Sequence, residues 1–184
     1  GKNMNSAQSQ PQKNKSKKKP IQTGDGVTHI NIWILGKTEL GKMLAHFYHM
    51  PFKHPRLGPF NSMEGLWHYV KTEEKDDTLR ALSGIKAKDY GKKLTRRHVK
   101  DFHAIINAAN FYKIEQNPRL VQLMVESDLP FEFYYLFGPD NIKITPPGYT
   151  WLVDGFEEIR RMLKEGRRPA DEDIDYTPLL DKKA

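Results

Sequence analysis

The strongest constraint on the fold is a long helical pattern over residues 97–115 that runs into the sequence EQNPRL. Its apolar positions recur at helical spacing and predict one buried face: Val99, Phe102, Ile106 and Ala109. In EQNPRL, Asn117 is a typical N-cap and Pro118 a typical first helical residue, so a second helix is expected to begin there and to end near Glu126. Two helices in direct succession predict a body built mainly from packed helices.

Shorter patterns complete the expected architecture. Further helices are expected at 38–49, 61–72, 78–82, 85–94 and 150–164. Thr38 is the expected N-cap of the first of these. Strands are expected at 27–35, 131–137 and 141–145, with a turn-rich connection at 51–59. The sequence therefore predicts a mostly helical α+β fold with a few short strands, forming a single domain over residues 25–167.

The two ends of the chain differ in composition from this domain. Residues 1–20 hold six lysines and no acid, so nearly all of the formal net charge of +7 lies there. With little apolar surface to bury, residues 1–24 are expected to form a disordered, lysine-rich tail. The lysines expected to contact nucleic-acid phosphates are Lys13, Lys15, Lys17, Lys18 and Lys19. A solubilising tail or an expression remnant is the alternative, and residues 168–184 are expected to form an acidic C-terminal tail.

Composition excludes several classes of function. The chain has no cysteine, which rules out disulfides, thiolate nucleophiles and zinc held by cysteine. No apolar run approaches the roughly 20 residues that span a bilayer, and the N-terminus lacks the apolar core of a secretory signal. The seven histidines are scattered without acids at ligand spacing, so no metal site is expected. We therefore expect a cytoplasmic protein without a membrane partner and leave its oligomeric state open.

The sequence FNSMEGLWHYVKT, residues 60–72, raises the central chemical question. The apolar residues that predict a helix with one buried face are Met63, Leu66, Trp67 and Val70. Glu64 lies at the start of this helix. It is either a catalytic carboxylate or one half of a capping box, in which Asn61 is the N-cap and Glu64 bonds back to its amide. Spacing alone favours the capping box.

Four short motifs follow one another between residues 30 and 124. The first comprises Leu40, Gly41, Leu44, Ala45, His46, Phe47, Pro51 and Phe52, and the second comprises Ser62, Glu64, Trp67, His68 and Lys71. The third is Ala87, Gly91 and Lys92, and the fourth is Ala109, Lys113, Ile114, Asn117, Pro118 and Leu120. In this order and at these separations they resemble the NADAR, or YbiA-like, family associated with NAD and ADP-ribose chemistry, and in particular its branch in large bacteriophages.

Three features depart from that family's pattern. An Asn of the first motif is replaced by His46, and a Gln of the second is replaced by His68. The acidic segment ending in Trp-Gly that usually closes the family's site has no clear counterpart here, and Trp151 is the residue that would partly replace its Trp. These departures imply an altered pocket wall.

The resemblance implies an N-glycosidase that hydrolyses the C–N bond between a ribose and a nucleobase. Such a bond breaks through an oxocarbenium-like transition state, which a carboxylate stabilises while cations bind the phosphates. Glu64 is the expected catalytic carboxylate, and ADP-ribose or a NAD-like compound is expected as substrate, with no further cofactor. The expected substrate-binding residues are His46, Phe47, Trp67, His68, Lys71, Gly91, Lys92, Lys113 and Trp151.

Lys113 occupies an apolar register position of its helix, where an unpaired charge is costly. One interpretation is that a bound phosphate or Glu64 compensates this charge. The other is that the lysine stem runs along apolar surface and its ammonium reaches water.

The resemblance leaves two functions open. The first is removal of ADP-ribose from a nucleobase such as DNA guanine, in the host cytoplasm if a phage encodes the chain. The family's hydrolysis of an early riboflavin-pathway intermediate is less favoured, because a basic tail serves no purpose on a small metabolite. The second is a catalytically weakened binding or structural module with the same fold, anchored by its basic tail to nucleic acid, a virion or a ribonucleoprotein.

Overall fold

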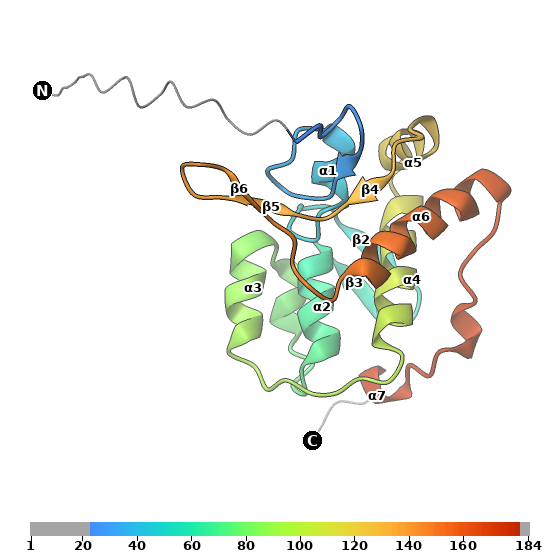
Figure 1. The fold of residues 1–184 in the computed structure, drawn as a ribbon. Coiled ribbons are helices and arrows are strands. Elements are labelled where there is room, and N and C mark those ends of the chain that lie inside the picture. The colour runs from blue at the N-terminus through green and yellow to red at the C-terminus, as the bar shows by residue number, and fades with distance from the viewer. Residues whose placement is uncertain (1–22, 181–184) are drawn as a thin grey trace, which may run out of the picture.

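A computed structural model describes residues 23–180 as a mainly helical chain with short strands (Figure 1). The helices are α1 (Glu39–Leu44), α2 (Met63–Lys71), α3 (Gly84–Lys92), α4 (Phe102–Glu115), α5 (Pro118–Glu126), α6 (Thr150–Glu165) and α7 (Thr177–Leu180). Two 3₁₀ helices span Asp77–Ala81 and Asp171–Asp173. The strands are β1 (Ile30–Asn31), β2 (Phe52–His54), β3 (Gly58–Phe60), β4 (Phe131–Glu132), β5 (Tyr135–Phe137) and β6 (Ile142–Ile144). The predicted α+β fold class is confirmed.

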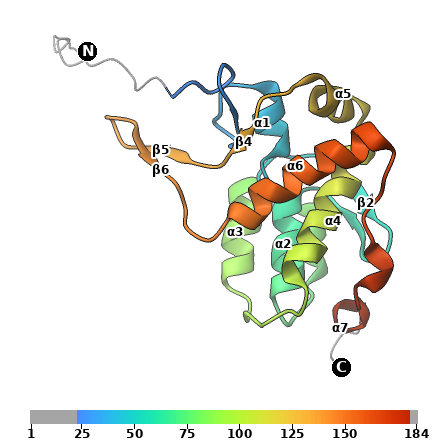
Figure 2. The same ribbon diagram turned by 45° about the vertical axis from the view of Figure 1, so that its right-hand side comes forward.

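Helix α2 is the centre of the helical layer. It packs against both α3 and α4, and α6 crosses α4 and also contacts α5 (Figures 1 and 2). The predicted inward residues Leu66, Val70, Ile106 and Ala109 are fully buried. The apolar stripes of α2 and α4 therefore form one shared core, as helical spacing predicted.

The strands form three separate pairs. β1 pairs with β4 in parallel, while β2 pairs with β3 and β5 pairs with β6 in antiparallel hairpins. The strand predicted over 27–35 is reduced to Ile30–Asn31. The alternation of Ile30, Ile32 and Ile34 with polar residues predicts one apolar face for it, and this prediction is wrong. His29 and Asn31 are buried as well as Ile30 and Ile32, and the polar side chains of both bond to Tyr134. The β2–β3 hairpin lies within the connection predicted at 51–59 and was not expected.

Several helix boundaries differ from the prediction. Thr38 is the N-cap of α1 and accepts a hydrogen bond from the Gly41 amide at 2.9 Å, as expected, but the helix ends at Leu44 because Ala45 is extended. Helix α4 begins at Phe102 rather than near residue 97, since Asp101 before it is left-handed, with φ at 61°. The strand predicted at 131–137 is divided into β4 and β5.

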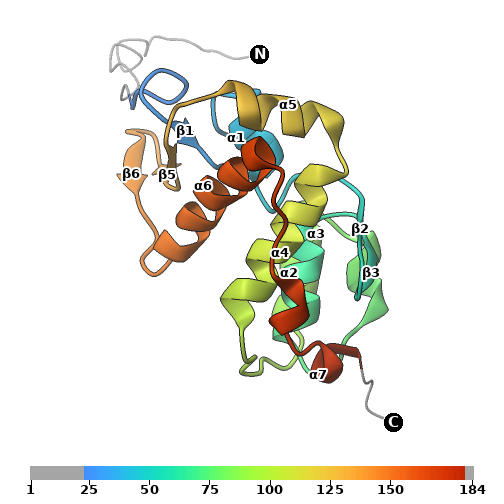
Figure 3. The same cartoon turned by 90° about the vertical axis from the view of Figure 1, so that its right-hand side faces the viewer.

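The segment after α6 packs on the core instead of extending into solvent (Figure 3). Tyr176 and Leu179 are each 1% exposed, although composition assigned them to an acidic tail. The hydroxyls of Tyr112 and Tyr176 both donate to the Asp171 carboxylate at 2.5 Å, and burial and this carboxylate raise the pKa of both tyrosines. Residues 168–180 are therefore tied to α4, while the five tail lysines predicted to bind nucleic acid lie outside the described residues.

Candidate active site

A cleft of about 340 Å³ opens where α2, α3 and the residues beside β1, β4 and β5 meet. Its polar and charged lining residues are His46, Glu64, His68, Lys88, Lys92 and Arg96. Its aromatic lining residues are Trp33, Phe47, Trp67, Phe133, Tyr135 and Tyr149. Among the lining residues Glu64 is the only carboxylate, and three cations accompany it. The cleft thus combines one acid, a basic rim and aromatic walls.

The start of α2 places the Glu64 carboxylate in this cleft. Ser62 is the N-cap of α2: its hydroxyl accepts from the Gly65 amide at 3.1 Å and donates to the Leu82 carbonyl at 2.9 Å. The predicted capping box with Asn61 is therefore wrong, and the Glu64 amide instead donates to the His46 carbonyl at 2.9 Å. Because Ser62 caps the helix, the Glu64 side chain is available to the cleft.

His68 holds the Glu64 carboxylate from one turn further along α2. Its Nε2 lies 3.0 Å from Glu64 Oε2, while the His68 side chain is 5% exposed and that of Glu64 is 14% exposed. The imidazole is enclosed by α3 at Gly91, where an added Cβ atom would lie 2.2 Å from His68 Cγ. Gly91, predicted to bind substrate, instead permits the close approach of α3 that fixes His68.

Lys113 and His46 form a polar layer under the cleft. Lys113 is fully buried, and its Nζ donates to the Ala45 carbonyl at 3.3 Å. The interpretation in which its ammonium reaches water is wrong, and burial lowers the pKa of Lys113 to about 7. Asn110 Nδ2 lies 3.1 Å from His46 Nε2, and burial, together with the charge of Lys113, lowers the pKa of His46 to about 3. His46 therefore lines the cleft as a neutral hydrogen-bonding group.

Besides Gly91 and Lys113, two more predicted ligand-binding residues lie outside the cleft lining. Trp151, near the start of α6, stacks on His103 with ring centroids 3.9 Å apart and lies 6.2 Å from Trp67. Lys71 Nζ lies 4.1 Å from the centre of the Phe102 ring, and burial lowers the pKa of this lysine. Trp67 lines the cleft itself, so Trp151 supports the wall from behind.

The structure brings six of the predicted residues to the cleft lining and leaves four elsewhere. The six are His46, Phe47, Glu64, Trp67, His68 and Lys92, and the four are Lys71, Gly91, Lys113 and Trp151. Sequence reasoning missed Lys88 and Arg96, although the four-residue spacing of Lys88 and Lys92 on one predicted helix was a detectable signal. It also missed Tyr149, which lines the cleft where Trp151 was expected.

Across 23–180 the helices are too short or too polar to cross a membrane. Within the same range, histidines and acids form no group of three or more that suits a metal ion.

Comparison with solved structures identifies a related fold. The NMR structure of the Escherichia coli protein YbiA matches with a TM-score of 0.55 and 16% sequence identity, over 76% of this chain and 90% of that one. No family model matches the chain, and no curated protein matches it either. The chain therefore has a YbiA-like α+β fold, as the four motifs predicted, while its assignment to a bacteriophage branch stays a prediction.

Proposed function

We propose that this chain is an N-glycosidase that releases ADP-ribose from a nucleobase, with guanine in DNA as the preferred target. The observation that carries the proposal is the single carboxylate of Glu64 in a cleft that also presents three cations. A glycosidic C–N bond breaks with positive charge developing on the ribose, and one carboxylate near the anomeric carbon stabilises that charge. The four motifs resemble a family with this class of chemistry, and the YbiA-like fold agrees with that resemblance.

In the proposed reaction Glu64 acts first as general base and then as general acid. It takes a proton from a water molecule whose oxygen bonds to the anomeric carbon, while the electron pair of the breaking C–N bond goes to the base nitrogen. The same proton then passes to that nitrogen. His68 donates to Glu64 Oε2 and keeps the carboxylate oriented during both transfers.

The remaining lining residues bind and orient the substrate. Half-buried Lys88 supplies positive charge for the pyrophosphate of ADP-ribose, while the exposed Lys92 and Arg96 supply it for phosphates at the rim of the cleft. Trp67 and Tyr149 offer ring faces for a nucleobase, and neutral His46 offers a hydrogen bond to a ribose hydroxyl. These groups exclude bulk water, other than the attacking molecule, when the substrate fills the cleft.

The test is to incubate DNA carrying ADP-ribosylated guanine with the full chain and with Glu64→Gln, and to detect released ADP-ribose by mass spectrometry. The proposal expects release by the wild type and at least about a hundredfold slower release by Glu64→Gln, as for loss of a general base. Lys86→Gln on α3, outside the lining residues, is the control and should cleave normally. Release that survives Glu64→Gln would exclude the mechanism.

The binding-module alternative gives a different result in the same experiment. A module without activity would release nothing in either form and still bind ADP-ribose or nucleic acid. Isothermal titration of the full chain with ADP-ribose then measures whether the cleft of an inactive protein still binds this ligand. The early riboflavin-pathway intermediate serves as a second substrate, because cleavage of it alone would move the target from nucleic acid to a small metabolite.

A further inference from the structure

The β5–β6 hairpin exposes large apolar side chains on one face. Tyr135 is paired with Ile144 and Phe137 with Ile142, and side chains directly opposite each other in an antiparallel pair share a face. Phe137 is 66% exposed and Ile142 is 56% exposed. Figures 1 and 2 show this hairpin projecting from the helical body. Single exposed apolar residues are ordinary, but four on one face of a projecting hairpin mark a contact surface.

This apolar face continues into the cleft. Tyr135 lines the cleft, and its ring centroid lies 6.0 Å from that of Trp33 and 5.5 Å from that of Phe133, which line it too. Lys92 and Arg96 line the same cleft from α3 and the segment after it, and both are exposed. An extended ligand that continues out of the cleft therefore contacts both aromatic rings and positively charged side chains.

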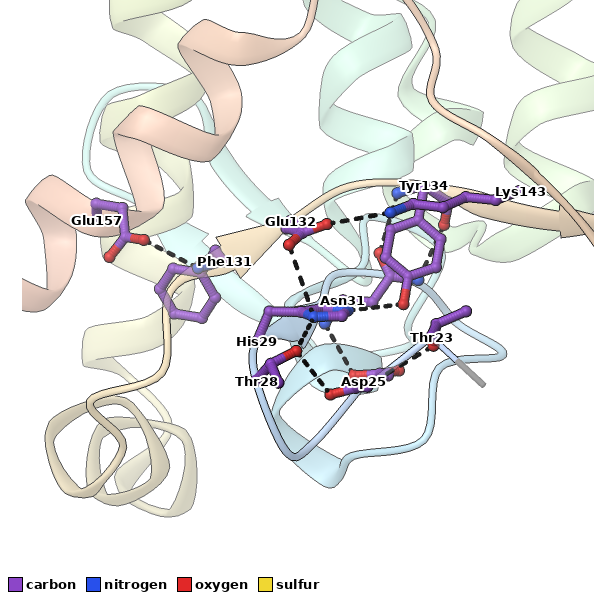
Figure 4. Close-up of polar contacts among 11 residues, drawn as sticks. Thr23, Asp25, Thr28, His29, Asn31, Phe131, Glu132, Tyr134, Lys143 and Glu157 are labelled. Atoms are coloured by element: carbon purple, nitrogen blue, oxygen red, sulfur yellow. Dashed lines mark hydrogen bonds and ion pairs between the residues drawn. The ribbon is translucent and has the colours of Figure 1, made fainter. Parts of the chain in front are cut away.

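The root of the hairpin is fixed by a buried polar network (Figure 4). The Asn31 side chain donates to the Tyr134 carbonyl and accepts from the Tyr134 amide, both at 2.9 Å. Asp25 accepts from the Asn31 amide at 3.0 Å. Outside this buried part, the exposed side chains of Lys143 on β6 and Glu132 form an ion pair at 3.5 Å. The apolar face is therefore held in one orientation toward the mouth of the cleft.

We propose that this hairpin face and the exposed Lys92–Arg96 rim hold the single-stranded nucleic acid that flanks the target base. The inference rests on the proposed function. A base inside a stack cannot reach an enclosed carboxylate, so it must leave the stack and its neighbours need new contacts. Phe137 and Tyr135 provide surfaces on which neighbouring bases stack, and Lys92 and Arg96 provide charge for the adjoining phosphates. A cleft lined by both aromatic and basic groups matches nucleic acid better than an apolar protein surface.

The test compares wild type with the double variant Phe137→Ser/Ile142→Ser. Leu180→Ser on α7, 42% exposed and away from the hairpin, is the matched control. Affinity for an unmodified, labelled single-stranded oligonucleotide is measured by fluorescence anisotropy in the Glu64→Gln background, so that binding is read without catalysis. We expect at least about tenfold weaker binding in the double variant, as for loss of one stacked base, and no change in the control.

Cleavage separates this inference from the proposed function. The double variant should lose about tenfold in kcat/KM on ADP-ribosylated oligonucleotide and nothing on free ADP-ribosylated guanosine, which also shows that it is folded. Equal kcat/KM for wild type and double variant on both substrates overturns the hairpin inference alone. If neither substrate is cleaved but oligonucleotide binding still depends on the hairpin, the proposed function fails and the binding surface stands. A dimer in sedimentation velocity that the double variant abolishes would assign the face to self-association and overturn the inference.

Discussion

Replacing Lys113 by Met tests whether a buried amine lies under the cleft. In the unfolded chain this amine titrates near 10.5, whereas in the folded protein burial lowers its pKa to about 7. Between these values the unfolded state binds more protons than the folded state, so the free energy of unfolding of the wild type rises with pH. Lys113→Met removes this contribution. The difference in stability between the two proteins must therefore depend on pH.

The magnitude follows from the two pKa values. A fully developed difference of one proton changes the free energy of unfolding by about 1.4 kcal/mol per pH unit. From pH 7 to pH 9 the wild type should gain about 2 kcal/mol relative to Lys113→Met, since the folded amine is still half protonated at pH 7. Loss of the hydrogen bond to the Ala45 carbonyl adds a cost to the variant of about 1 kcal/mol that does not change with pH.

Urea denaturation at several pH values provides the assay. Lys93→Met is the matched control, because this lysine is exposed and its replacement should leave the pH dependence unchanged. Only the slope of the difference matters, since constant packing terms cancel. A difference between wild type and Lys113→Met that stays flat from pH 7 to pH 9 would refute the burial of an amine at this position.

Three further changes test the geometry around Glu64. Gly91→Ala should lower the free energy of unfolding by about 1–3 kcal/mol and reduce cleavage, because its Cβ atom would overlap His68. Urea denaturation measures the stability and a cleavage assay the rate, and a variant unchanged in both would contradict the close approach of α3 to His68. His68→Gln should keep most of the kcat, because an amide can still donate to Glu64, whereas His68→Leu should lower kcat at least about tenfold. Equal kcat values for these two variants would exclude a positioning role for His68. Ser62→Ala should cost about 1–2 kcal/mol in a thermal melt, because both the cap and the bond to Leu82 are lost, and a cost near zero would argue against Ser62 as N-cap.

Helix existence could be predicted from local spacing, but the cap that frees Glu64 could not. Asn61 and Ser62 are both good N-caps, and they differ by one position. Contacts with residues distant in the sequence decide which of the two is the N-cap. The Asn61 amide donates to the Arg80 carbonyl, and the Ser62 hydroxyl donates to the Leu82 carbonyl. A contact of that kind leaves no periodic trace in the sequence.

The basic rim was only partly predictable for a related reason. Lys92 was expected from its motif, whereas Lys88 precedes it by one turn of α3 and Arg96 follows after the helix has ended. Helical spacing applies to the first pair and not to the last, because the chain beyond Lys92 turns instead of continuing. The position of Arg96 is set by the pairing of residues 72 and 96 in an isolated antiparallel bridge.

The two imidazoles that replace amides in the motifs explain how an altered site keeps an ordered carboxylate. His46 is neutral and bonded to Asn110, and His68 is bonded to Glu64, so each imidazole fills a hydrogen-bonding position that an amide would fill. The missing Trp-Gly segment has a different consequence, because Trp151 stacks on His103 and leaves Tyr149 to line the cleft. Hydrogen-bonding groups therefore still surround the carboxylate, while the segment before Trp151 forms the exposed β5–β6 hairpin and contributes Tyr135 and Tyr149 to the wall. The proposed chemistry depends on Glu64 and His68, and the choice of substrate is expected to depend on the aromatic residues of the wall.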